Sequence, residues 1–147
     1  MSTPSQELQE GARILRDVLA SYGFSYVATE AGRGSGGQFA TGEFIRGDYI
    51  LSFSVRHGLG IVEYSVGGRS ISHEDYLRYS GVWEVRSYPG YGGSIRDDFE
   101  GLAKDLASHL ASFVRGERDT FLSVVALREA NPIRFKGFSV LGRNSAA

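Results

Sequence analysis

The stretch QFATGEFIRGDYILSFSVRHGLGIVEYSV, residues 38–66, decides the fold of this chain. Its apolar residues recur at every second position, which is the period of a β-strand. Two turn-forming pairs, Gly47–Asp48 and His57–Gly58, interrupt this alternation. Gly47 is the first residue of its pair, and glycine at the first position is the mark of a type II′ turn, which commonly joins antiparallel strands. The stretch therefore predicts three antiparallel strands connected by two tight turns.

The two turns set the register of the strands. The first places Arg46 opposite Tyr49, and the second is expected to place Arg56 opposite Leu59. Both hairpins then assign one face to apolar residues and glycine: Ala40, Gly42, Phe44, Tyr49, Leu51, Phe53, Val55, Gly60, Val62, Tyr64 and Val66. The opposite face is mixed: Phe39, Thr41, Glu43, Ile45, Ile50, Ser52, Ser54, Arg56, Leu59, Ile61, Glu63 and Ser65. We expect the first face to be buried beneath helices and the second to be partly exposed.

One N-terminal helix and two or three later helices are predicted to pack on one face of this sheet. Residues 94–116 carry one apolar stripe with a helical period, with Ser94 as N-cap and Gly116 as the stop. The segment 3–23 has a capping box and turns Leu8, Ala12, Leu15, Leu19 and Tyr22 inward. Shorter helices are expected at 73–79 and, with a strand as the alternative, at 120–130. With an edge strand at 24–30, the sequence predicts one α+β domain over residues 1–147, with a four-stranded antiparallel meander.

Composition excludes several classes of function. The 147 residues contain no Cys and three His, so a disulfide framework or a thiolate metal site is excluded and no metal site is expected. The formal net charge is -1 without a run of five or more like charges, which argues against nucleic acid as a partner. No export signal or membrane-spanning stretch is recognised, so we expect a cytoplasmic protein.

The segment 76–91 is the first candidate binding surface. It gathers six aromatic and arginine side chains of the kinds that dominate protein interfaces: Tyr76, Tyr79, Trp83, Arg86, Tyr88 and Tyr91. Some of these rings could instead close the end of the sheet and belong to the core. The sequence leaves both possibilities open.

The mixed face of the sheet is the second candidate. The predicted register places Glu43 and Glu63 on either side of Ser52, about 10 Å apart at two strand spacings, with Arg56 on the same face. Carboxylates at such a distance can divide acid and base work in a hydrolase. They can equally serve as solvated charges on a sheet face. No residue is assigned a catalytic role and no cofactor is expected.

Other motifs have structural explanations. The segment AGRGSGG, residues 31–37, contains a G-x-G-x-x-G string but precedes a strand instead of opening a helix, so we expect a hairpin loop. His73 lies beside Glu74 and Asp75 and is expected at a solvated helix start.

Three segments carry a resemblance to other proteins: residues 51–78, residues 88–93 (YPGYGG) and residues 97–116. Over residues 22–116 the chain resembles a group of short uncharacterised bacterial proteins, and it has the general look of small immunity proteins that neutralise polymorphic toxins. The resemblance implies a single-domain cytoplasmic protein that holds a protein partner. From it and the two candidate surfaces we expect a non-enzymatic binding domain. A small hydrolase using Glu43 and Glu63, or a structural homo-oligomer that buries Ile45, Ile50 and Ile61, is the alternative.

Overall fold

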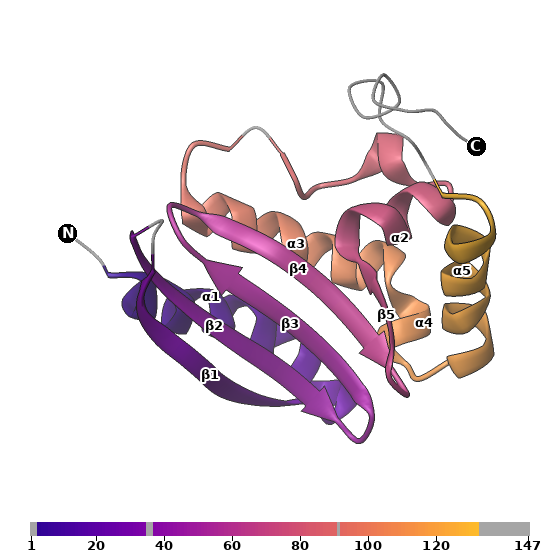
Figure 1. The fold of residues 1–147 in the computed structure, drawn as a ribbon, viewed down its shortest axis with the longest axis horizontal. Helices are drawn as coiled ribbons and strands as arrows, with labels where there is room; N and C mark the ends of the chain where they lie inside the picture. Colours follow the sequence, from indigo (N-terminus) through magenta and orange to yellow (C-terminus); the bar gives the residue numbers. More distant parts are fainter. Residues whose placement is uncertain (1–2, 35–36, 91, 133–147) are drawn as a thin grey trace.

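The computed structural model describes residues 3–34, 37–90 and 92–132 of the chain. Within them the fold is α+β: an N-terminal helix, an antiparallel sheet and then further helices (Figure 1). The helices are α1 (Pro4–Leu19), α2 (His73–Tyr79), α3 (Ile95–His109), α4 (Ala111–Val114) and α5 (Arg118–Ala130), with short 3₁₀ helices η1 (Ala20–Tyr22) and η2 (Trp83–Val85). The strands are β1 (Ser25–Gly34), β2 (Gly37–Arg46), β3 (Tyr49–Val55), β4 (Leu59–Val66) and β5 (Arg69–Ser72).

The five strands form a meander in the order β1-β2-β3-β4-β5. The register predicted for the first hairpin is confirmed, from Arg46 opposite Tyr49 to Ala40 opposite Val55. Gly47 has a φ of 60°, as the first position of a type II′ turn requires. The alternation of apolar and polar residues and the glycine at the turn were therefore sufficient to predict this hairpin.

The second hairpin differs from the prediction at its tip. Val55 pairs with Leu59 rather than with Gly60, and a register shift restores the predicted pairing at Phe53 and Val62. The connection thus contains three residues, with His57 in the left-handed region at a φ of 58°. This bulge rotates Leu59 into the core, whereas a two-residue turn would have left it on the mixed face.

The sheet has one strand more than predicted. β5 pairs with β4 through a turn at Gly67 and Gly68, whose φ values of 60° and 84° fit a type I′ turn. At the other edge, β1 continues through Gly34, so the glycine-rich segment expected to be a loop is largely strand. Glycine can adopt an extended backbone like any other residue. Residues 31–34 therefore form strand, because β2 supplies their backbone pairing partners.

The helices largely confirm the apolar patterns. Thr3 and Gln6 form the predicted capping box of α1, and Leu8, Ala12, Leu15 and Leu19 are buried. Tyr22 was expected to point inward but is 38% exposed, because the chain tightens into η1 after Leu19.

The long helix predicted at 94–116 is instead two helices. It breaks at Leu110, whose φ of -110° and ψ of 29° interrupt the α-helical path, and resumes as α4. Leu110 and Phe113 are nevertheless both buried, as the stripe predicted. The segment expected to be either helix or strand at 120–130 lies in helix α5.

The helices leave one face of the sheet uncovered by the described residues. Figure 1 views the molecule from that side, with α1 and α3 behind the strands and α5 beyond β5. Phe44, Leu51 and Tyr64 are among the side chains buried between sheet and helices. In the described part of the chain, no helix is long and apolar enough to cross a bilayer.

Candidate functional site

The aromatic segment 76–91 is divided between core and surface. Tyr76 and Tyr88 are buried, so neither ring can contact a partner. Tyr79 and Trp83 are partly exposed, while Tyr91 lies outside the described residues. Of the six candidates, Tyr79, Trp83 and Arg86 therefore remain as described surface groups.

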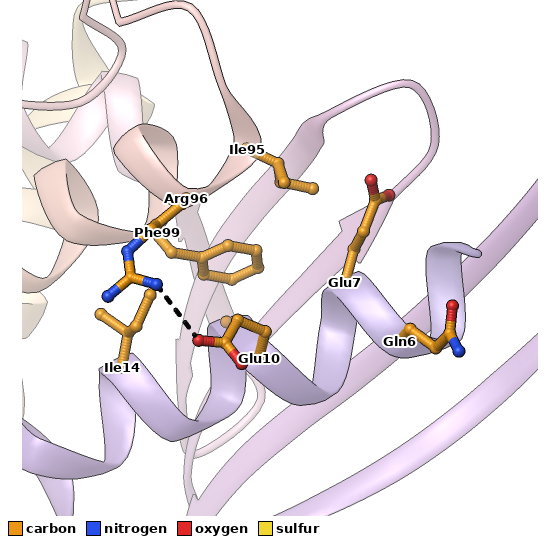
Figure 2. A pocket seen from close by; sticks show the side chains of 8 residues that line it. Gln6, Glu7, Glu10, Ile14, Ile95, Arg96 and Phe99 are labelled. Carbon is orange, nitrogen blue, oxygen red and sulfur yellow. Dashed lines mark ion pairs between the residues drawn. The ribbon is translucent and has the colours of Figure 1, made fainter. Parts of the chain in front are cut away.

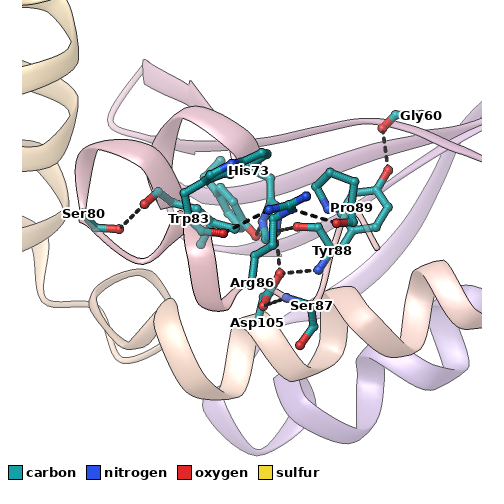
Figure 3. A network of polar contacts seen from close by, with 11 residues as sticks. Gly60, His73, Ser80, Trp83, Arg86, Ser87, Tyr88, Pro89 and Asp105 are labelled. Atoms are coloured by element: carbon teal, nitrogen blue, oxygen red, sulfur yellow. Dashed lines mark hydrogen bonds and ion pairs between the residues drawn. The ribbon is translucent and has the colours of Figure 1, made fainter. Parts of the chain in front are cut away.

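A buried polar network holds this segment in place (Figure 3). His73 lies at its centre, and its Nδ1 is 2.7 Å from the hydroxyl of Tyr64. Its Nε2 is 3.0 Å from both the Asp105 carboxylate and the carbonyl oxygen of Tyr88. Both neighbours of Nε2 are acceptors, so Nε2 carries hydrogen and donates, and in the neutral ring Tyr64 donates to Nδ1. Every polar atom of the imidazole has a partner.

Asp105 joins this network to the loop before α3. Its carboxylate accepts hydrogen bonds from the backbone N–H groups of Ser87 and Tyr88, at 2.7 and 2.8 Å. Burial raises the pKa of Asp105, but its hydrogen bonds with His73, Ser87 and Tyr88 lower it, and the net shift is downward. Asp105 is therefore a buried carboxylate whose ionised form is stabilised by donors from two segments.

The network is structural rather than catalytic. His73 and Asp105 are both fully buried, so a substrate cannot reach them. Burial also raises the pKa of Tyr64 well above its ordinary value, which keeps its hydroxyl protonated as a donor. The expectation of a solvated His73 is wrong, because the start of α2 faces the core. The sequence did offer one indication: Asp105 falls beside Leu106 on the buried side of the stripe of α3.

Trp83 lies on the surface held by this network. The guanidinium carbons of Arg78 and Arg86 lie 4.0 and 3.9 Å from the ring centroid, so the protein's own cations cover the indole. Arg86 also donates to the carbonyl oxygens of Trp83 and Pro89. These groups are committed to intramolecular contacts, and little of the ring is left for a partner.

The second set of candidate residues lies on the uncovered face of the sheet, at the positions that the predicted register gave them. Glu43 and Glu63 pair with Ser52 from opposite sides, on β2, β3 and β4. Neither carboxylate makes a hydrogen bond or an ion pair with any residue that the structure describes. The fourth candidate, Arg56, lies at the end of this face with its guanidinium carbon 5.3 Å from the ring centroid of Phe39.

Apolar side chains surround these carboxylates. Ile61 is 73% and Val27 is 46% exposed, and both belong to this face. Ile45 and Ile50, which pair with each other, are partly exposed beside them. The face thus combines unpaired charge with accessible apolar surface.

A shallow depression of about 260 Å³ lies near the middle of the uncovered face. Its lining includes the hydroxyl groups of Thr29, Thr41, Ser52 and Ser54 together with Glu43 and Ile61. Glu63 does not line it, so the depression receives one carboxylate of the pair.

A second hollow, of about 360 Å³, lies between α1 and α3 (Figure 2). Phe99 and Ile14 form apolar walls, and an ion pair of Arg96 with Glu10, at 3.6 Å, lies beside them. Gly11 is required here because a Cβ at this position would lie 2.3 Å from the Phe99 ring. The closeness of the two helices explains this glycine without a ligand.

No group of three or more His, Asp or Glu side chains in the described ranges could hold a metal ion.

Comparison with known protein families, with curated proteins and with solved structures gives no match for this chain.

Proposed function

We propose that this protein is a non-enzymatic protein-binding domain and that its binding surface is the uncovered face of the sheet. The observation that carries the proposal is the pairing of exposed apolar side chains, above all Ile61, with carboxylates that have no described partner. Exposed apolar area favours burial against another surface. Unpaired charges contribute specificity when the partner supplies the opposite charge.

The segment 76–91 supports the proposal less well. Tyr76 and Tyr88 are buried, and Trp83 is covered by two guanidinium groups of the same chain. Arginine and aromatic side chains that already bind one another have less to gain from a partner. We therefore place the partner on the sheet face and treat the Trp83 surface as structural.

Two alternatives predict different behaviour. A hydrolase would need Glu43 and Glu63 to act on one substrate, yet only Glu43 lines the depression. A structural homo-oligomer would bury Ile45, Ile50 and Ile61 against a second copy. The resemblance to immunity proteins favours a foreign protein as the partner, which in that class would be a toxin.

The test compares two exposed apolar residues on different surfaces. Tagged protein is used to capture partners from its native cell extract, with Ile61→Asp on the sheet face and Val85→Asp, which is 64% exposed on η2, as the matched control. We expect a stoichiometric protein to be retained by the wild type and by Val85→Asp and lost by Ile61→Asp. Thermal melting checks that both variants are folded.

Three outcomes would contradict the proposal. Retention of the partner by Ile61→Asp would remove the sheet face as the binding surface. Recovery of the chain alone, with a dimer in sedimentation that Ile61→Asp dissociates, would establish the homo-oligomer. Glycosidic or other hydrolytic activity lost in Glu63→Gln would establish the enzyme.

A further inference from the structure

The depression on the uncovered face has a regular construction. Glu43 pairs with Ser52, and Thr41 pairs with Ser54 one step further along the same two strands. On one face of a sheet, such a group of four stands at the corners of a rectangle about 5 Å by 7 Å. Thr29 and Ile61 extend the depression towards β1 and β4.

The oxygen atoms at these corners are acceptors with spare capacity. Thr29 and Thr41 share a hydrogen bond of 2.7 Å, and the Ser54 hydroxyl accepts from the backbone N–H of Ile61 at 3.2 Å. A hydroxyl oxygen has two lone pairs, so each can accept from a further donor. The carboxylate of Glu43 has no hydrogen-bonding partner in residues 3–34, 37–90 and 92–132. The depression is therefore rich in acceptors and carries a negative charge.

We propose that the depression beside Glu43 receives a lysine side chain of the protein partner. This assignment rests on the proposed function and adds the chemistry of the group that is recognised. The ammonium group is compact and has three N–H donors that diverge, which suits acceptors at the corners of a small rectangle. A guanidinium group is planar and prefers two parallel bonds to one carboxylate, so it would engage Glu43 alone and leave the neighbouring hydroxyl acceptors unused.

The surroundings fit the rest of a lysine side chain. Its methylene stem can lie on Ile61, at the rim of the depression. Two positions further along the strands, the Ile45 and Ile50 pair offers apolar area for the partner's neighbouring residues. Arg56 remains at the far end of the face, over Phe39, where it does not neutralise Glu43.

The experiment uses n-butylammonium as the probe, because it reproduces the amine and stem of lysine. Its binding to the full chain is followed by amide chemical shifts in a titration at constant ionic strength. We expect saturable shifts at Thr41, Glu43, Ser52 and Ile61. Butanol, which lacks the charge, should leave these signals unchanged.

Two isosteric variants locate the site. Glu43→Gln should weaken the binding of n-butylammonium about tenfold, because it removes a charge-assisted hydrogen bond. Glu63→Gln, on the same face but outside the depression, should change it by less than about twofold because an exposed charge at two strand spacings is strongly screened.

Several results would overturn the assignment. They are the absence of saturable shifts, an equal loss of binding in Glu63→Gln, or tighter binding of ethylguanidinium than of n-butylammonium. The proposed function fails separately, when the captured partner is retained by Ile61→Asp. A partner lost in Ile61→Asp but unaffected by Glu43→Gln would keep the binding face and reject the lysine.

Discussion

Polar groups on the helix-covered side of the sheet and on its uncovered face differ in their hydrogen bonding. On the covered side, His73 of α2 and Asp105 of α3 are buried, and every hydrogen-bonding atom of the imidazole has a partner within the protein. On the uncovered face, Glu43 and Glu63 are partly exposed and have no described partner. Polar groups that satisfy one another stabilise the fold, whereas polar groups left unsatisfied beside apolar surface are available to another molecule.

The largest effect should come from the covered side. Asp105→Ala leaves His73 and two backbone N–H groups without their acceptor, and we expect a loss of about 3–5 kcal/mol in the free energy of unfolding. Urea denaturation measures it. Asp97→Ala, in the exposed first turn of the same helix, should cost less than about 1 kcal/mol. Similar losses of unfolding free energy in the two variants would mean that the buried network contributes no more to stability than an exposed carboxylate does.

Packing of the helix layer should give the next largest effect. Gly11→Ala would normally stabilise a helix by about 1 kcal/mol, but here the new methyl group collides with Phe99. We expect a net destabilisation of about 1–3 kcal/mol from overpacking. Gly93→Ala, where a Cβ meets nothing within 4 Å, is the control and should change stability by less than about 0.5 kcal/mol. A gain in stability for Gly11→Ala would show that α1 and α3 can move apart freely.

Acid should reveal the same network through its pH dependence. The pKa of Asp105 is lower in the folded protein than in the unfolded chain, so its stabilising contribution is present above about pH 4 and is lost as pH falls through the folded pKa. Hydrogen bonding to Arg118 also lowers the pKa of Asp48, which adds a change of the same sign in every variant. Unfolding free energy measured from pH 6 downward should therefore fall less steeply in Asp105→Asn than in the wild type. Equal slopes would assign acid sensitivity to other carboxyl groups.

The smallest effect is expected on the uncovered face. Glu43→Gln changes no described hydrogen bond or ion pair, so the free energy of unfolding should change by less than about 0.5 kcal/mol. The same urea denaturation assay applies, with Glu63→Gln alongside. A loss above about 1 kcal/mol in either variant would give these carboxylates a structural role and weaken the contrast between the faces.

Local pattern predicted those parts of the fold that depend on neighbouring residues. The first hairpin and the cap of α1 follow from alternation, turn chemistry and the Thr3–Gln6 capping box. The break at Leu110 was not predictable in this way, because one non-helical residue leaves the spacing of the apolar stripe nearly unchanged. The register shift between Leu59 and Val62 was missed for a similar reason: a two-residue and a three-residue connection fit the same sequence.

The candidate site was predictable where register alone decides it. Glu43, Ser52 and Glu63 lie side by side as their positions in the hairpins required. The burial of Tyr76 and Tyr88 was not predictable, since it depends on helices far along the chain. The contact between His73 and Asp105 joins residues 32 positions apart, and no local pattern relates them.

The register shift in β1 affects how copies of the protein behave in concentrated solution. β1 is a ten-residue edge strand that pairs with β2 alone among the described strands, so its outer backbone groups could template a foreign strand. The irregularity between Ala28 and Glu30 divides that edge into two short runs that a single straight strand cannot follow. An interruption of this kind protects the chain against fibril-like stacking, while the sheet face beside it stays open.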